Sequence, residues 1–157
     1  MKRLMNKKGI TLIELLVVIA LIVIMLSIAI PMYNRWVKKE DVSGDVQKIY
    51  SALNELRVRA FSGKQECKMQ WAANPFKKVD LYCGGSKIGE IQLKNDFEGS
   101  IKLGVSYVDF SSDGTADHNG NIHIKGDDYG ARYSCVNISE IRISLGKWDG
   151  TDCNTEE

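Results

Sequence analysis

The chain opens with an unbroken apolar run. Residues 10–30 are apolar except for Thr11, Glu14 and Ser27. At about 1.5 Å per residue, a helix over this run is roughly 31 Å long, which is enough to cross the hydrocarbon core of a bilayer. The pattern therefore predicts a membrane-spanning helix over residues 10–30.

After residue 30 the apolar positions are spaced by three and four residues, which marks one face of a helix. The residues of this stripe are Val42, Val46, Ile49, Leu53, Leu56 and Ala60. The segment Ser62-Gly63-Lys64 supplies a glycine stop. We therefore expect an amphipathic continuation of the helix over residues 31–63. A kink or a locally unwound turn is expected near Pro31 or Gly44.

Residues 64–157 contain short segments of β character, separated by Gly, Asn, Asp and Pro. The predicted strands are 67–71, 79–83, 90–93, 101–110, 121–125, 132–138 and 141–145. Within 101–110, alternate residues, Leu103 among them, are expected to share one face, with a bulge where Val108 breaks the phase. The elements predict a single α+β domain in which the long N-terminal helix packs on an antiparallel sheet.

Basic residues on the two sides of the apolar run predict its orientation. Four cations precede it and three follow it, namely Lys2, Arg3, Lys7 and Lys8 against Arg35, Lys38 and Lys39. The positive-inside rule then places the N-terminus in the cytoplasm and residues 64–157 outside the cytoplasmic membrane.

Disulfides form in that outer compartment, and the chain has an even number of cysteines, Cys67, Cys83, Cys135 and Cys153. Four cysteines allow three pairings. The pairs Cys67–Cys83 and Cys135–Cys153 are favoured because each closes a loop of about 15 to 18 residues, which stabilises the fold by roughly 3 kcal/mol. The cysteines lack the C-x-x-C spacing and a nearby histidine ligand, so no metal site is expected.

The acid in the apolar run needs a counter-charge. A carboxylate at mid-membrane costs about 2.5 to 3.5 kcal/mol on insertion scales. A cut between Gly9 and Ile10 would create an α-amino group four residues before Glu14, in the same subunit or in a neighbouring one. Cleavage would therefore generate the partner of Glu14.

These N-terminal residues resemble those of type IV prepilins and pseudopilins. The resemblance rests on the basic leader ending at Gly9, on Ile10, on the run TLIELL with Glu14, and on Pro31. It implies that a prepilin peptidase removes a leader of residues 1–9 and methylates the amine of Ile10, a position that is usually Phe or Met in the family. It also implies a pilin-like fold, with Glu14 and Pro31 serving assembly of a filament whose core consists of apolar stems.

The same resemblance implies partners and a location. The partners are other pilin or pseudopilin subunits, the prepilin peptidase and an assembly platform in the inner membrane. The chain would wait in the bacterial inner membrane with its N-terminus in the cytoplasm and residues 64–157 in the periplasm. It would then enter a pilus or pseudopilus that can reach the cell surface.

A second resemblance covers residues 107–124, which are similar to the strand, loop and strand of GspH/FimT-type minor pilins and pseudopilins. Phe110, Gly114 and 122–124 carry it. The hypothesis is a minor structural subunit of a type IV pilus-like filament. The alternatives are a GspH-type pseudopilin of a type II secretion system and a pilus-tip subunit that binds DNA for uptake. Many relatives carry a Gly-Arg-x-Arg signature, sometimes linked with DNA capture, where this chain has Gly-Lys-Trp-Asp at 146–149.

Charge argues against nucleic acid as a partner. Four of the 21 Lys and Arg residues lie in the leader, which leaves 17 against 20 Asp and Glu residues. Binding driven by phosphate contacts favours the opposite sign. The local candidates for a basic and aromatic patch are expected to be solvated lysines and core aromatic side chains; they are Lys77, Lys78, Lys147, Trp71, Phe76 and Trp148.

Two loops rich in oxygen ligands, 113–119 and 149–154, depart from the EF-hand pattern and favour ordinary turn chemistry over calcium binding. His118 and His123 are expected at the surface. The sequence lacks G-x-S-x-G, H-E-x-x-H and P-loop motifs. We therefore expect neither catalytic activity nor a cofactor.

Overall fold

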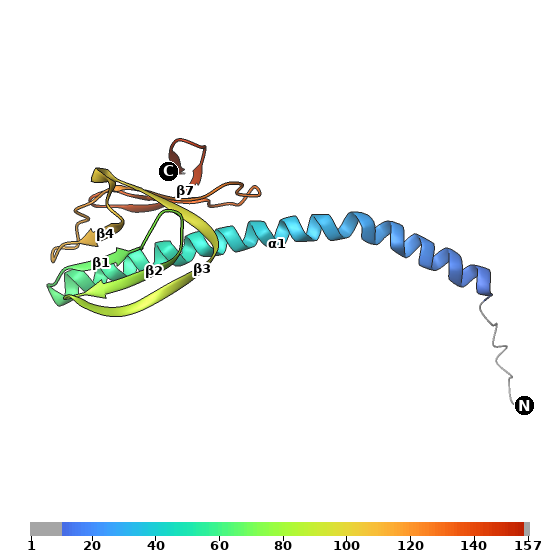
Figure 1. Ribbon diagram of the computed structural model, residues 1–157, viewed down its shortest axis with the longest axis horizontal. Coiled ribbons are helices and arrows are strands. Elements are labelled where there is room, and N and C mark those ends of the chain that lie inside the picture. The colour runs from blue at the N-terminus through green and yellow to red at the C-terminus, as the bar shows by residue number, and fades with distance from the viewer. Residues whose placement is uncertain (1–10, 156–157) are drawn as a thin grey trace, which may run out of the picture. The chain divides into compact units, whose positions relative to one another are not determined.

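The structure is a computed structural model that describes residues 11–155. It divides into two compact units, one ending at Trp36 and the other starting at Val37. The helix α1 (Leu12–Gly63) supplies residues to both units. Figure 1 shows α1 and the strands of the second unit.

Eight strands form one antiparallel sheet in the described residues. They are β1 (Cys67–Gln70), β2 (Phe76–Cys83), β3 (Ser86–Ile101), β4 (Tyr107–Phe110), β5 (Gly120–Ile124), β6 (Cys135–Ile138), β7 (Ile143–Trp148) and β8 (Cys153–Thr155). Their order in the sheet is β4-β1-β2-β3-β5-β6-β7-β8. The predicted α+β class, a helix packed on an antiparallel sheet, is confirmed.

The core lies between the second part of α1 and the sheet. All six residues of the predicted helix stripe, Val42 to Ala60, have no solvent-exposed area. They belong to one apolar cluster that also contains Phe97 of β3, Phe110 of β4 and Val136 of β6. Full burial of a Leu or Ile side chain contributes about 1.5–3 kcal/mol. The stripe therefore shares one apolar core with strands β1 to β7.

The structure shows how the helix ends and whether it is interrupted. The helix ends at Gly63, but Lys64 adopts the left-handed conformation, with φ 49°. The N–H of Gln65 then donates to the carbonyl of Ala60 at 3.3 Å. The helix is continuous at Pro31 and Gly44, so the locally unwound turn is not formed at either residue, and the alternative, a kink, stays a prediction.

The strand predicted over 101–110 is wrong. β3 ends at Ile101, a short 3₁₀ turn covers Lys102–Gly104, and β4 begins at Tyr107. Leu103 has φ 70° and is 81% exposed, so it does not share a buried face with its neighbours. The physical reason is the following Gly104, at φ 69°, because glycine allows the chain to turn in the left-handed region.

The sheet also differs from the predicted strands in length and number. β3 spans 16 residues where the sequence pattern indicated four. It pairs with β2 from Ser86 to Phe97 and with β5 from Phe97 to Ile101. β8 was not predicted. β3 is therefore the strand that joins the two halves of the sheet.

β3 carries a bulge. The register between β2 and β3 jumps from Phe76↔Phe97 to Lys78↔Gln92, so residues 93–96 oppose a single residue of β2. The backbone N–H groups of Lys94 and Asn95 turn instead toward the helix. Residues in such an insertion have no partner on the neighbouring strand, so their N–H groups need other hydrogen-bond acceptors.

Asp45 of α1 supplies those acceptors. Its carboxylate accepts hydrogen bonds from the N–H of Lys94 at 2.7 Å, from the N–H of Asn95 at 3.0 Å and from the side-chain amide of Asn95 at 3.1 Å. The ammonium of Lys48 lies 2.8 Å away. Asp45 is fully buried, and a buried carboxylate is tolerated when its oxygens are satisfied in this way. The carboxylate of Asp45 therefore connects α1 to the bulge of β3 by hydrogen bonds.

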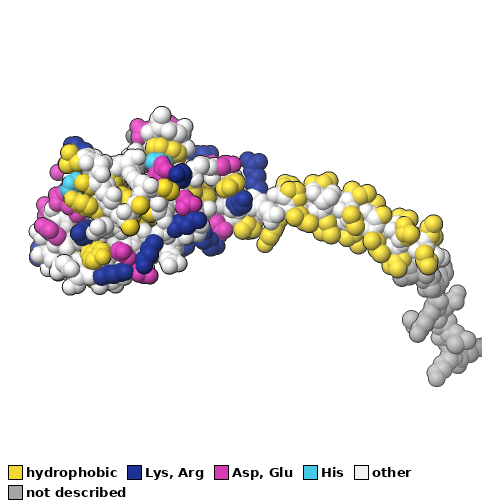
Figure 2. Space-filling model, viewed as in Figure 1, with side chains coloured by type: hydrophobic (Ala, Val, Ile, Leu, Met, Phe, Trp, Pro, Cys, Tyr) yellow, Lys and Arg dark blue, Asp and Glu magenta, His cyan; other side chains and the backbone are white. Residues whose placement is uncertain are grey.

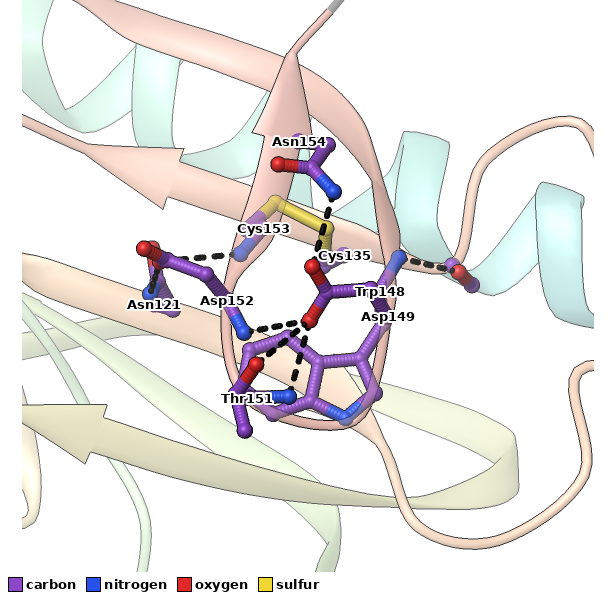
Figure 3. Close-up of a disulfide and its surroundings, with 9 residues drawn as sticks. Asn121, Cys135, Trp148, Asp149, Thr151, Asp152, Cys153 and Asn154 are labelled. Carbon is purple, nitrogen blue, oxygen red and sulfur yellow. Dashed lines mark hydrogen bonds between the residues drawn. A yellow bond between two sulfur atoms is a disulfide. The ribbon is translucent and has the colours of Figure 1, made fainter.

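Two disulfides link strands of the sheet. Cys67–Cys83 joins directly paired positions of β1 and β2, and Cys135–Cys153 joins β6 to β8. These are the two pairings that the short loops favoured. Figure 3 shows the second disulfide, between Cys135 and Cys153. It passes close to Gly146 of β7, where a Cβ atom would lie 2.8 Å from Sγ of Cys153. Glycine at this position therefore makes room for the disulfide.

We predict that Asp45→Ala lowers the free energy of unfolding by about 2–6 kcal/mol, because it leaves two part-buried N–H groups without an acceptor at about 1–3 kcal/mol each. Asp45→Asn keeps one acceptor oxygen and should cost less. Urea unfolding of the full chain in detergent, followed by tryptophan fluorescence, measures both. As a control, Glu55→Ala removes only an exposed ion pair with Arg59 and should change stability by less than about 1 kcal/mol. Equal losses for Asp45→Ala and Glu55→Ala would contradict the role of Asp45.

Candidate functional site

The most unusual surface of the chain is the apolar side of residues 12–30, which we call the stem. Every large apolar side chain of the stem is exposed, from 47% for Val18 to 81% for Leu12. Figure 2 shows these side chains along the helix. Among the described residues, α1 is the one helix long and apolar enough to cross a membrane. A continuous apolar surface of this size marks a site that contacts lipid or protein.

The stem begins at an N-cap. The hydroxyl of Thr11 accepts a hydrogen bond from the N–H of Glu14 at 3.3 Å, and the carbonyl of Thr11 accepts one from the N–H of Leu15 at 3.2 Å. The sequence T-x-x-E at 11–14 is the spacing of a capping box. This role of Thr11 was missed from sequence, although the motif could have revealed it.

Glu14 lies in the first turn of α1 and is exposed. A carboxylate in this position interacts favourably with the partial positive charge of the helix N-terminus. The helix start thus places the acid near the end of the stem where a cut after residue 9 would leave an amine. Gly9 and Ile10, the predicted cleavage and methylation residues, lie outside the described residues.

Pro31 follows directly after the stem and lies within α1. Its ring nitrogen has no hydrogen to donate to the carbonyl one turn earlier. The helix accommodates this loss without interruption. Its role in assembly stays a prediction.

The loop at 149–154 is organised by one carboxylate, as Figure 3 shows. Asp149 accepts hydrogen bonds from the N–H groups of Asp152 at 2.7 Å and Thr151 at 2.9 Å, and from the side chains of Thr151 and Asn154 at 2.9 Å each. These bonds, led by the N–H of Asp152, hold the pKa of Asp149 well below its usual range. The carboxylate therefore shapes a turn.

The other oxygen-rich loop has the same construction. Asp113 accepts hydrogen bonds from the hydroxyl of Thr115 at 2.6 Å and from its N–H at 2.9 Å. These two bonds lower the pKa of Asp113. Within residues 11–155, no group of three or more His, Cys, Asp and Glu side chains could hold a metal ion.

The surface position expected for His123 is wrong. The ring is 7% exposed and stacks on Trp148, with ring centroids 3.7 Å apart and planes 5° apart. Burial lowers the pKa of His123, and Glu98, whose Oε2 lies 3.8 Å from Nε2, opposes the shift. Trp148 covers the ring across the sheet, which the local sequence around His123 does not reveal. His118 is partly buried, and its Nδ1 lies 2.6 Å from Oδ1 of Asp109.

The candidate nucleic-acid residues do not form one patch. Lys77 and Lys78 lie on β2 and Lys147 on β7, with β3, β5 and β6 between them in the sheet. Trp71 is 2% exposed and stacks on Phe76 in the core, with centroids 4.8 Å apart.

The two lysines of β2 are paired with acids. Nζ of Lys77 lies 3.3 Å from Asp96, and Nζ of Lys78 lies 2.8 Å from Glu90. Hydrogen bonds from Lys78 and then Lys87 lower the pKa of Glu90 to about 2. The positive charges of Lys77 and Lys78 are therefore compensated by neighbouring carboxylates.

Comparison with known proteins bears on both units. A family model, the prokaryotic N-terminal methylation motif, matches residues 4–30. The type IV major fimbrial protein FimA of Dichelobacter nodosus is 31% identical over 80 residues, which cover 50% of this chain and 51% of FimA. The chain thus spans about half the length of this relative.

Two crystal structures of the type IV minor pilin FimU from Pseudomonas aeruginosa are similar to this one. Their TM-scores are 0.53 and 0.50, with 15% and 19% sequence identity. The matches cover 70% and 65% of this chain and 91% and 90% of FimU. At this low sequence identity, the match shows a similar fold and no more.

A methylation motif, an exposed apolar stem and a helix packed on an antiparallel sheet define a pilin-like architecture. The match to the methylation motif over residues 4–30 bears out the N-terminal resemblance, and the helix packed on an antiparallel sheet has the fold of FimU.

We predict that His123 makes the domain less stable as the pH falls from about 7.5 to about 5. Its folded pKa lies below the usual 6.5, so the unfolded chain binds the proton more readily and stability is lost as pH falls through about 6.5. His123→Phe keeps a ring against Trp148 and should reduce this pH dependence. Thermal unfolding across this pH range measures it, with His118→Phe as the matched control. The assignment fails if His123→Phe retains the full loss of stability.

Proposed function

We propose that this chain is a minor structural subunit of a type IV pilus-like filament and assembles through its stem. The observation that carries the proposal is the stem itself, which is exposed along its whole described length and bears the single carboxylate Glu14 near a capped helix start. A soluble monomer would expose such a surface to water at a large hydrophobic cost.

Before assembly, the stem would lie in the bacterial inner membrane. The N-terminus would face the cytoplasm, and the domain with its two disulfides would lie in the periplasm, where such bonds form. Prepilin peptidase would cut after Gly9 and methylate the amine of Ile10. An assembly platform in the inner membrane would then move the subunit into the filament.

Glu14 would direct that transfer. Moving an apolar helix from lipid to a bundle of other stems brings little hydrophobic gain, because lipid tails and stems are both apolar. A carboxylate in an apolar surrounding, by contrast, strongly favours a position next to a cation. Pairing with the α-amino group of a neighbouring subunit would therefore select the correct stagger between stems.

The names of the similar proteins favour a pilus over a type II secretion pseudopilus. FimA is a fimbrial protein, and FimU is a type IV minor pilin. The proposed role is structural. DNA capture is less favoured, because the candidate lysines of β2 are paired with acids and lie apart from Lys147.

We predict that Glu14→Gln prevents entry into filaments, because the neutral side chain keeps its size but loses the charge that pairs with the amine. Glu14→Asp keeps the charge and should retain partial entry. The amount of subunit in sheared filaments, relative to the amount in membranes, measures the effect. Intact mass must show the same removal of residues 1–9 in all three forms. Normal entry of Glu14→Gln would contradict the pairing.

We predict that deletion of the gene reduces surface pili and leaves the release of extracellular enzymes unchanged. Counting pili, DNA uptake and enzyme release in the same cultures checks this, with the intact gene restored as the control. Lost enzyme release with normal pili would instead indicate a pseudopilin. Normal pili with lost DNA uptake would favour the tip subunit that binds DNA.

A further inference from the structure

Directly after the stem, the helix exposes two aromatic side chains. Tyr33 is 64% exposed and Trp36 is 58% exposed, and their ring centroids lie 6.2 Å apart. They are three residues apart in α1, so they share one side of the helix. Elsewhere in the chain a tryptophan such as Trp71 is buried at 2% exposure. The exposed pair therefore contributes nothing to a core.

Other residues of this turn have the same character. Met32 is 74% exposed, and Arg35 is exposed beside the aromatic pair in sequence. In the sequence, Lys38 and Lys39 follow. Residues 32–36, which we call the collar, thus combine apolar bodies, polar ring tips and a cation.

The position of the collar along the helix matches a particular layer of the bilayer. At about 1.5 Å per residue, Tyr33 lies about 4.5 Å and Trp36 about 9 Å beyond Ile30 along the axis. The polar headgroup region adds about 5–8 Å to each side of the hydrocarbon core. If residues 10–30 fill the hydrocarbon, Tyr33 lies in the headgroup layer and the backbone of Trp36 lies at its outer edge. Helical side chains lean toward the N-terminus of the helix, so the ring of Trp36 reaches back into the layer.

The chemistry of the collar suits that layer. Tyr and Trp have an apolar ring and one hydrogen-bonding group, so they are stabilised where hydrocarbon meets water. An Arg side chain at a helix end extends its guanidinium toward lipid phosphates.

We propose that the collar, with Tyr33 and Trp36 at its centre, binds the periplasmic headgroup layer of the phospholipid bilayer and fixes the depth of the stem before assembly. The inference rests on the proposed membrane location of the stem. It adds a second contact with lipid, at the end of the stem opposite Glu14. Leaving the membrane would then require the aromatic pair to be withdrawn from the headgroups, separately from the transfer of the stem.

The test uses the full chain in vesicles of palmitoyl-oleoyl phosphatidylethanolamine and phosphatidylglycerol. The signal of Trp36 is the difference between the native chain and Trp36→Phe. We expect a blue shift of its emission on insertion and stronger quenching by lipids brominated near the top of the acyl chain than by lipids brominated near its end. Quenching by aqueous iodide without quenching by lipid would overturn the proposal. Protection from both kinds of quencher would assign the collar to a protein contact and would also overturn it.

A reporter in the stem separates this inference from the proposed function. Ile19→Trp, in the Trp36→Phe background, should be quenched most by lipids brominated near the end of the chain. If this reporter is deep and Trp36 is aqueous, the collar proposal fails and the membrane location stands. If the reporter is not quenched by lipid, both fail.

A double substitution tests whether the collar sets the depth. Tyr33→Leu with Trp36→Leu keeps apolar bulk but removes the polar ring tips, so the Ile19→Trp reporter should shift its ratio of shallow to deep quenching. Phe61→Leu, which removes an exposed aromatic ring of α1 outside the collar, is the matched control and should leave the ratio unchanged. An unchanged ratio in the double variant would overturn the role of the aromatic pair in setting depth.

Discussion

The globular unit depends on one buried carboxylate. Asp45 projects from α1 into a bulge of β3, and its oxygens satisfy the backbone N–H groups of Lys94 and Asn95. The apolar stripe of the helix gives most of the stabilisation, but apolar packing alone does not define how far the helix slides along the sheet. The hydrogen bonds of Asp45 define the position of the helix along the sheet, because they connect one helix residue to one bulge. The joining strand β3 is thereby held in register with both halves of the sheet.

The division into two units reflects two opposite uses of apolar surface. In the second unit, the helix stripe is fully buried against the sheet, so its free energy stabilises the fold. In the stem, the same kinds of side chain are exposed and are available for contacts outside the chain. A single helix can do both because its backbone hydrogen bonds are satisfied internally in water, lipid or protein alike. Its surroundings can therefore change while its conformation is kept.

The sequence revealed the features that depend on local periodicity. The helix stripe and the apolar run are regular over many residues. All six predicted stripe residues are buried, and the described part of the apolar run is helical from Leu12. The features that were missed depend on contacts between distant segments. The sequence around Asp45 indicates an ordinary polar helix residue, because it does not show that the bulge of β3 lies opposite. The sequence around His123 indicates an exposed residue, because it does not show that Trp148 covers the ring. Apolar and polar residues alternate through Leu103 in the sequence, but Leu103 and Gly104 both adopt the left-handed conformation and end the strand there.

The two outermost strands of the sheet are short. β8 has three residues, one of them tied back by the disulfide of Cys153, and β4 has four, with Phe110 also bridged to Ala116. A long free edge would be a template on which another copy could add a strand. Subunits that crowd together in one membrane or filament meet at high local concentration. Under the proposed function, these short edges would let subunits join through their helices while their sheets stay separate.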